Sequence, residues 1–284
     1  MGVFERARAA AKQRQPRVVF PEIDNAIVAE AARRLETGGI ARVVALADAS
    51  EDQVAAMQKV RPIKAGLAHR LLTRPLYRAA AMVAAGQADV MVAGISHPTR
   101  RVIEAAAMAI GLAEDCATPS SFFLMSLPEG RDLIFADCAL NVDPDAARLA
   151  DIARASAKSA AALLGRADVA LLSYSTGASG AGGSVDKVRE AAALCGFTGP
   201  IQADAALNAV IAAKKGVPGA QANTLIFPNL DAGNIAYKLV QELAGAQAIG
   251  PLLQGFRHPV CDLSRGATVD DIVKATVLTI AMMQ

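Results

Sequence analysis

The sequence predicts an α/β fold of two domains, each with a mainly parallel sheet covered by helices. Short apolar runs rich in Val, at 17–22 and 42–48, flank a segment with helical periodicity at 24–39. Strands that are apolar throughout are typical of parallel sheets buried on both faces. With 284 residues, 53% of them hydrophobic, the chain suffices for one large or two medium domains.

Strands and helices alternate through the first half of the chain. After an amphipathic opening helix come the elements named above, and Ser50 and Gln53 then predict a capping box for a further helix. A helix near 75–86 precedes a buried strand at 88–94, which leads into the segment ISHPT and another helix. This βαβ order predicts a ligand site beyond the carboxyl ends of the strands.

The middle of the chain interrupts this order. Two short apolar strands flank the turn signal PEGRD at 128–132, as in a hairpin, and a long Ala-rich helix is expected at 145–164. Strands and helices then alternate again up to 258. We therefore expect a discontinuous first domain of residues 1–137 plus 259–284 and a second domain of residues 138–258.

Composition and charge favour a small-molecule partner. The net charge is +2 with the two signs well mixed, which argues against binding to nucleic acid or to a membrane surface. Residues 1–17 hold no apolar stretch like that of a signal peptide, and no apolar run approaches a membrane span, so we expect a cytoplasmic protein. Scattered cysteines and few histidines predict buried or structural thiols and no metal site. These residues are Cys116, Cys138, Cys195, Cys261, His69, His97 and His258.

A glycine-rich loop follows the strand near 169 and precedes a helix. Its backbone N–H groups can approach a bulky anion, although the loop matches neither the Walker pattern nor the full dinucleotide-binding pattern. An ordinary turn is the alternative. The loop contains Gly177, Gly180, Gly182 and Gly183 together with Ser173, Ser175, Thr176 and Ser179.

The stretch 259–281 holds the densest group of reactive side chains. Ser264 and Arg265 lie in a loop, Thr268 is suited to cap the following helix, and Asp271 comes three residues later. A helix N-terminus beside an arginine can bind phosphate or a developing oxyanion. An ordinary capped helix with solvated acids is the alternative.

Several motifs in order resemble the phosphate acetyltransferases: SYSTGASGAGGSVDKVREA, IQADAAL, TLIFPNLDAGNIAYKLVQ, AIGPLLQG and DLSRGATVDDI, with looser likeness in VAGISHPTRRVIEAA and FFLMSLP. The resemblance covers essentially the whole chain. It implies reversible acetyl exchange between acetyl phosphate and coenzyme A by direct transfer, with coenzyme A as a substrate and with no tightly bound cofactor or metal. It also implies isocitrate dehydrogenase-like domains, an active site in the cleft between them and a homodimer.

The resemblance assigns Asp271 as the base, Ser264 as the residue that stabilises the reacting group, and Arg265 as a substrate-binding arginine. These residue types suit the chemistry, because a thiol is mostly protonated at neutral pH and a carboxylate can take its proton during attack. A hydroxyl can donate to the oxyanion, and a guanidinium can hold phosphate with two bonds. Further substrate-binding candidates are Ser173, Thr176, Gly177, Ser179, Gly180, Asn234, His97 and Arg257.

Two positions depart from the family pattern, because Glu104 and Glu242 stand where arginines are expected. Either Arg100, Arg101 or Arg257 substitutes for them, or the acids face away, or acetyl phosphate binding is lost, as in a module that senses acyl-CoA. Phosphate butyryl transfer is the nearest enzymatic alternative. Structural roles are expected for most other polar groups nearby: Asp204, Asn229, Asp231, Tyr174 and Tyr237.

Overall fold

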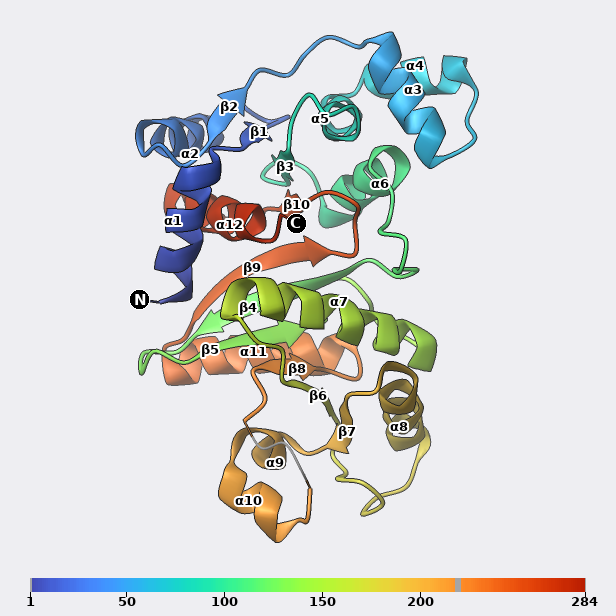
Figure 1. Ribbon diagram of the computed structural model, residues 1–284, viewed down its shortest axis with the longest axis vertical. Coiled ribbons are helices and arrows are strands. Elements are labelled where there is room, and N and C mark those ends of the chain that lie inside the picture. Colours follow the sequence, from blue (N-terminus) through green and yellow to red (C-terminus); the bar gives the residue numbers. More distant parts are fainter. Residues whose placement is uncertain (1, 218–220, 284) are drawn as a thin grey trace. The chain divides into compact units, whose positions relative to one another are not determined.

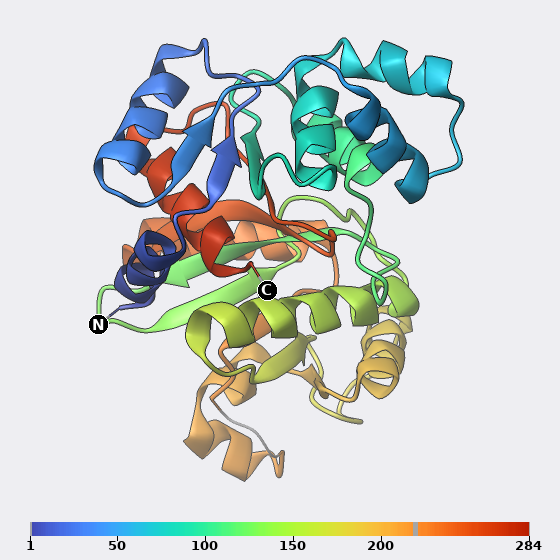
Figure 2. The same ribbon diagram turned by 45° about the horizontal axis from the view of Figure 1, so that its top comes forward.

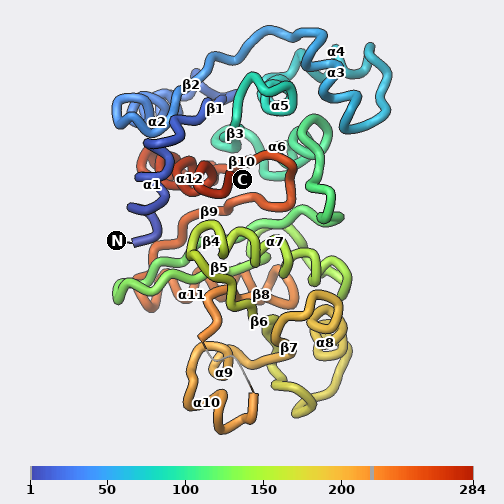
Figure 3. Tube along the Cα trace, in the orientation of Figure 1, coloured from blue at the N-terminus to red at the C-terminus, as the bar shows by residue number. Residues whose placement is uncertain are grey.

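The computed structural model describes residues 2–217 and 221–283, which form two compact units (Figure 1). The first unit comprises Met1–Asp115 and Gly250–Gln284, and the second comprises Cys116–Ile249. Figure 3 follows the chain from the first unit through the second and back. These limits differ from those expected from the sequence: the predicted hairpin lies wholly in the second unit, and 250–258 belongs to the first.

The sheet of the first unit has the order β2-β1-β3-β10-β9. Its first four strands are parallel, and β9 runs antiparallel to β10. The predicted mainly parallel sheet is therefore confirmed here. The bounds are β1 Arg17–Val19, β2 Arg42–Val44, β3 Val90–Ala93, β9 Gln247–Gln254 and β10 Val260–Asp262.

Helices cover both faces of this sheet (Figures 1 and 2). On one face α12 packs against β3 and β10 and contacts α1 and α2, while α5 and α6 pack on the other face and contact α3. The sequence did not predict α4. The bounds are α1 Val3–Arg14, α2 Ala26–Thr37, α3 Glu51–Val60, α4 Ala65–Leu72, α5 Pro75–Ala84, α6 Thr99–Ala109 and α12 Val269–Ala281.

The strands of the second unit that pair among themselves have the order β4-β5-β8-β6-β7. The antiparallel pair β4–β5 is the predicted hairpin, and the remaining pairs are parallel. The strands are β4 Ser120–Ser126, β5 Asp132–Ala136, β6 Val169–Leu172, β7 Thr198–Ile201 and β8 Thr224–Ile226. The helices are α7 Ala146–Leu164, α8 Gly183–Cys195, α9 Ala203–Leu207, α10 Ala209–Lys214 and α11 Leu230–Ala244.

Local sequence signals account for several helix ends. The helix expected at 145–164 is α7, which Asp145 caps, and Thr268 and Asp271 form both halves of the capping box of α12. Ser50 does cap α3, but the side chain of Gln53 donates to Gln87 and to a backbone carbonyl instead of closing the predicted box. Tertiary contacts therefore outcompete the local motif at Gln53.

Close packing joins two neighbouring strand ends in the first unit. The backbone N–H of Leu263, just after β10, donates to the carbonyl of Ala93 at the end of β3, over 2.7 Å. Gly94 has φ +120°, and a Cβ there would lie 2.5 Å from Asp262 Oδ1 and 2.6 Å from the Leu263 nitrogen. Only glycine fits, so the chain after β3 lies directly against the chain after β10.

We expect Gly94→Ala to lower the free energy of unfolding by about 2–5 kcal/mol, because it combines backbone strain with overpacking. Urea unfolding measures the effect. Gly66→Ala in α4 is the matched control, since no atom outside its chain neighbours and its own helix backbone lies within 4 Å of the added methyl group, and it should be neutral or slightly stabilising. Equal stability of the two variants would contradict the close packing at Gly94.

Candidate active site

The loop between β10 and α12 presents the residues singled out by the sequence. Ser264 and Arg265 are exposed, and the turn is held by bonds from the Gly266 nitrogen to Ser264 Oγ and from the Ala267 nitrogen to the Ser264 carbonyl. Among the described residues, Arg265 makes no hydrogen bond or ion pair. Its guanidinium is therefore available to an anion beside the start of α12.

Asp271 lies in the first turn of α12 and is exposed. Its Oδ2 accepts hydrogen bonds from the Thr268 backbone N–H over 2.9 Å and from the Thr268 hydroxyl over 2.7 Å. Both bonds end on the same oxygen, and Oδ1 accepts no hydrogen bond in the described part of the chain. The carboxylate is thus oriented by the helix cap while one oxygen can still accept a proton.

The neighbouring Asp270 faces a different partner. Its Oδ1 accepts a hydrogen bond from Arg34 of α2 over 2.8 Å. Adjacent helical residues point about 100° apart, so Asp270 and Asp271 occupy different sides of α12. The two acids therefore have separate environments.

Asp262, the last residue of β10, is a buried acid directly before this loop. Its Oδ2 accepts a bond from the Thr99 hydroxyl over 2.5 Å, and its Oδ1 is buried without a partner among the described residues. Burial raises the pKa of Asp262 to about 7, and the nearby charge of Glu22 adds to the rise, whereas the Thr99 bond opposes it. Asp262 was not among the site residues expected from the sequence.

His97 lies in the segment that follows β3, as expected, and contacts an acid that the sequence analysis also missed. His97 Nδ1 is 2.7 Å from Glu22 Oε1, and Glu22 further accepts three backbone N–H bonds from residues 94–96. The signal for Glu22 was its place at the end of the predicted strand 17–22. Ligand sites in α/β folds gather at such ends.

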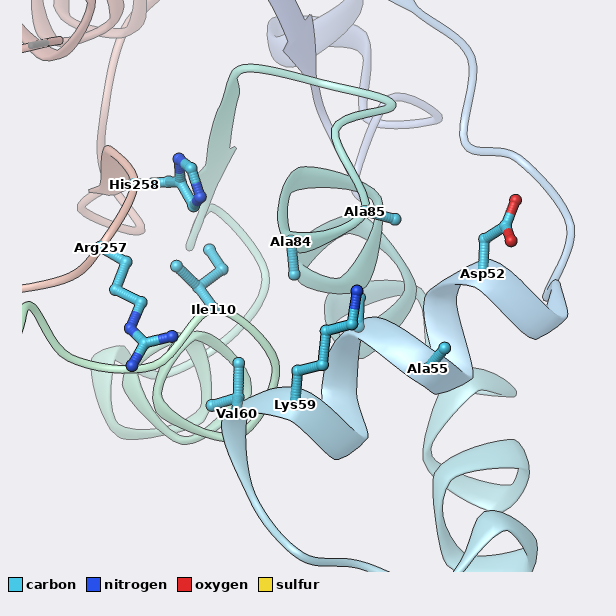
Figure 4. A pocket seen from close by; sticks show the side chains of 10 residues that line it. Asp52, Ala55, Lys59, Val60, Ala84, Ala85, Ile110, Arg257 and His258 are labelled. Carbon is cyan, nitrogen blue, oxygen red and sulfur yellow. The ribbon is translucent and has the colours of Figure 1, made fainter.

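Arg257 lines a pocket of about 360 Å³ in the first unit (Figure 4). The pocket also contains Lys59 and His258, and it lies where α3, α5 and α6 end. Helix C-termini carry partial negative charge, and Arg257 Nε donates to the carbonyl of Leu112 over 3.1 Å. Asp52 also lines the pocket, and Arg257 is partly engaged by a backbone carbonyl, so this pocket gives no independent support for an anion site.

The departures from the family pattern have distinct surroundings. Glu104 accepts bonds from Arg100 over 2.9 Å and from Arg101 over 3.0 Å, and the Arg100 bond is the main reason why the pKa of Glu104 is lowered. Glu242 of α11 is exposed and has no described partner in the parts of the chain that the structure covers. Arg100 and Arg101 are thus engaged by Glu104 and are not free guanidinium groups.

The glycine-rich loop of the second unit satisfies many of its own polar groups. Thr176 donates its N–H to Ser179 Oγ and its hydroxyl to Gln202, while the Gly177 nitrogen donates to the Pro200 carbonyl. Ser173 Oγ accepts the N–H of Ser175, and a Cβ at Gly180 would lie 3.0 Å from Ser175. These bonds shape the loop, and substrate contact by its residues stays a prediction.

Three further polar candidates of the second unit make structural contacts, and substrate contact by Asn234 stays a prediction. Asn234 donates to the Cys138 carbonyl over 3.0 Å, Asn229 caps α11, and Asp204 pairs with Lys215. Tyr237 stacks on Phe123 with ring centroids 4.1 Å apart, which confirms its packing role.

The packing role expected for Tyr174 was wrong. Tyr174 is 63% exposed, although its hydroxyl donates to the Ala181 carbonyl as expected of a satisfied hydroxyl. The ring spans the glycine-rich loop instead of entering the core, because that hydrogen bond holds it across the loop.

The candidate residues fall into two groups. The first unit holds the trio of the C-terminal loop and helix together with His97 and Arg257, and the second unit holds the glycine-rich loop and Asn234. Among the described residues, no three His, Cys, Asp or Glu side chains are grouped as a metal site requires. None of the described helices is both long and apolar enough to cross a membrane.

The buried Asp262 predicts a specific pH dependence of stability. Because its pKa is raised from 3.8 to about 7, the folded state holds a proton that the unfolded state has lost between these values, so stability falls as pH rises through this window. The contribution lost is at most about 4 kcal/mol.

Urea unfolding of the wild type and of Asp262→Asn at pH values from 4 to 8 tests this. We expect the variant to gain stability relative to the wild type as pH rises, because Asn does not ionise. If the difference in free energy of unfolding between wild type and Asp262→Asn did not change with pH, the raised pKa of Asp262 would be contradicted.

Comparisons with known proteins show the family to which the chain belongs. A family model described as phosphate acetyl/butaryl transferase matches residues 48–280. The phosphate acetyltransferase of Paracoccus denitrificans is 38% identical, with 98% of each chain covered. That of Pseudomonas aeruginosa is also 38% identical over 98% of this chain, which spans only 44% of the length of that relative.

Solved structures show the same fold. A phosphotransacetylase from Streptococcus pyogenes matches with a TM-score of 0.90 and 34% identity, covering 98% of this chain and 97% of that one. A phosphotransacetylase from Staphylococcus aureus matches with a TM-score of 0.87 and 30% identity, covering 98% of both chains. The α/β fold predicted from the sequence is confirmed, and the chain belongs to the phosphate acetyl/butaryl transferase family.

Proposed function

We propose that this chain catalyses reversible transfer of an acetyl group between acetyl phosphate and coenzyme A. The observation that carries the proposal is the group formed by Ser264, Arg265 and Asp271 on one loop and the first helical turn that follows it. The names of the relatives, phosphate acetyltransferase and phosphotransacetylase, support the choice of reaction.

In the proposed reaction, Asp271 accepts the proton of the coenzyme A thiol as the sulfur attacks the acetyl carbonyl carbon. The C–S bond forms, the carbonyl oxygen becomes an oxyanion, and its collapse breaks the C–O bond to phosphate. Ser264 donates its hydroxyl hydrogen to the oxyanion, and one such donor is worth about 3 kcal/mol in the transition state. Arg265 binds the phosphate and stabilises it as it leaves.

The arrangement of Asp271 fits the role of a base. Thr268 holds one carboxylate oxygen by two hydrogen bonds, which fixes the direction in which the other oxygen points. The cysteines are poorer candidates for chemistry, since burial raises the pKa of Cys261 to about 12 and that of Cys138 well above its usual range. Direct transfer to coenzyme A needs no protein thiol.

A module that binds acyl-CoA without turnover is the second candidate, and one observation favours it. Glu104 and Glu242 place negative charge where the family resemblance implies arginines, and an acid near a phosphate site weakens anion binding. The charge of Glu104 is offset by Arg100 and Arg101, so the local balance there remains positive. We therefore prefer the enzyme.

Turnover of acetyl, propionyl and butyryl phosphate with coenzyme A tests the proposal. We expect acetyl phosphate to be the best substrate. A clear preference for butyryl phosphate would instead assign a phosphate butyryltransferase. Turnover has to be measured because an added methylene changes selectivity by only about 1–3 kcal/mol in an apolar pocket. A homodimer and a cytoplasmic location are further parts of this proposal, to be tested by light scattering and cell fractionation.

For the base, we expect Asp271→Asn to lower turnover by roughly 10²–10⁴-fold while coenzyme A still binds. Thr268→Ala is the matched control, because it removes a hydroxyl from the same capping box and leaves the carboxylate in place. It should cost about 0.5–2 kcal/mol of stability and lower turnover far less than Asp271→Asn does, because the Thr268 backbone N–H still orients the carboxylate.

Asp270→Asn is the second control and should matter little for turnover, since Asp270 pairs with Arg34. Steady-state kinetics and thermal unfolding of all three variants separate catalysis from capping. Full activity of Asp271→Asn would remove this residue from the mechanism.

For the phosphate anchor, we expect Arg265→Lys to raise the KM for acetyl phosphate by about tenfold or more, because an ammonium cannot reproduce a bidentate fork. The KM for coenzyme A should change less. Glu104→Ala and Glu242→Ala should leave the KM for acetyl phosphate unchanged or lower it, since each removes a negative charge. A large loss of affinity in either Glu variant would show that the acid acts in the site itself.

A further inference from the structure

Glu22 is a buried acid whose four hydrogen-bond donors all come from one short segment. Only 5% of its side chain is exposed. Oε2 accepts the backbone N–H of Gly94 over 2.6 Å and that of Ile95 over 3.1 Å, and Oε1 accepts that of Ser96 over 2.7 Å. Oε1 also lies 2.7 Å from His97 Nδ1. Glu22 therefore bonds to every residue from 94 to 97.

The bonding of Glu22 orients the His97 ring. Both oxygens of Glu22 accept backbone N–H groups, and we assign the hydrogen between Oε1 and Nδ1 to the ring. A carboxylate that holds one ring nitrogen of a histidine in this way fixes the orientation of the ring and the role of the other nitrogen. Nε2 lies on the opposite edge of the ring, and 37% of the His97 side chain is exposed.

The pair lies at one end of the sheet of the first unit, where Ser264 and Arg265 also emerge. β1, β3 and β10 are parallel neighbours, as Figure 1 shows, and Glu22, His97 and Ser264 each follow the end of one of them. The chain after β3 is fixed to the chain after β10 by the 2.7 Å bond between the Leu263 nitrogen and the Ala93 carbonyl. The carboxyl ends of such strands are where α/β folds place ligands.

A purely structural role is the competing explanation. Three backbone N–H bonds would anchor the loop whether or not the imidazole contacted a ligand, and a buried carboxylate needs such partners. An anchoring role does not explain the fourth contact, between Glu22 and His97 Nδ1. That contact orients a partly exposed imidazole whose other nitrogen, Nε2, bonds to no described residue. When both ring nitrogens carry a hydrogen, Nδ1 donates to Glu22 and the outer Nε2 also donates, and such a cation paired with a buried acid suits an anionic ligand.

We propose that His97 contacts the phosphoryl group of acetyl phosphate through Nε2 and that Glu22 is the positioning residue that holds the ring for this contact. This assignment rests on the proposed function. Glu22 does not touch substrate; it acts through His97. The pair supplies a donor to phosphate in a chain in which Glu104 and Glu242 stand at expected arginine positions.

A double-mutant cycle tests the coupling. We expect His97→Gln to raise the KM for acetyl phosphate about tenfold to hundredfold, as for a lost bond to a charged group, with the KM for coenzyme A little changed. Glu22→Gln should raise it by a similar factor in the wild type but by less than about threefold on top of His97→Gln, because residues that act as a unit are not additive. Glu22→Asp, which keeps the charge, should recover part of the affinity and serves if Glu22→Gln does not fold.

The exposed pair His69 and Glu51, 3.4 Å apart on α4 and α3, provides matched controls. His69→Gln and Glu51→Gln should leave both KM values unchanged. Thermal unfolding of every variant reports loss of the loop anchor separately from loss of binding.

An unchanged KM for acetyl phosphate in His97→Gln would overturn the proposal. The proposal would also be overturned if the Glu22 and His97 substitutions raised the KM for acetyl phosphate by independent factors that multiply in the double variant. Glu22 would then only anchor the loop. Calorimetric titration with inorganic phosphate distinguishes this inference from the proposed function, since it needs no turnover. If the wild type fails to turn over acetyl phosphate, weaker phosphate binding in His97→Gln still supports the contact, and equal binding in both proteins contradicts it.

Discussion

The carboxylate of Glu22, bonded to the backbone after β3, is the interaction on which the candidate site in the first unit depends. It is buried just beyond the end of β1 and takes up three successive N–H groups that would otherwise lack partners. Gly94, within this segment, packs against Asp262 and Leu263 so closely that no side chain fits. Glu22 thus holds the segment after β3, and that segment in turn packs against the start of the Ser264 loop.

Two buried acids at the same strand ends differ in how they are satisfied. Glu22 has four N–H partners, whereas Asp262 has the Thr99 hydroxyl on one oxygen and no described partner on the other. Burial and the charge of Glu22 raise the pKa of Asp262, so a proton is the remaining way to reduce the cost of burying its charge. The loop that carries the proposed catalytic groups thus starts directly after a buried acid whose pKa is raised.

Much of the fold could be predicted from the sequence because its signals are local. The hairpin, the helix after Asp145 and the capping box of Thr268 and Asp271 each depend on residues close in the chain. The trio Ser264, Arg265 and Asp271 could be found for the same reason. Glu104 pairs with Arg100 and Arg101 at helical spacing, so this pairing could also have been predicted from the sequence.

The contacts that the sequence analysis missed are long-range. Glu22 meets His97 across 75 positions of the chain, and Thr99 meets Asp262 across 163, so no spacing rule links them. The side chain of Gln53 likewise donates to Gln87, in the segment between α5 and β3, instead of completing its expected capping box. These contacts form only in the folded chain, where segments far apart in the sequence lie side by side.

The most direct test of the account is to mix the protein with acetyl-CoA and measure free thiol with and without inorganic phosphate. The account predicts thiol release only when phosphate is present, with one acetyl phosphate formed for each thiol, since phosphate is the acetyl acceptor. Tight binding of acetyl-CoA without phosphate-dependent release of coenzyme A would contradict it and would assign the chain to a binding role.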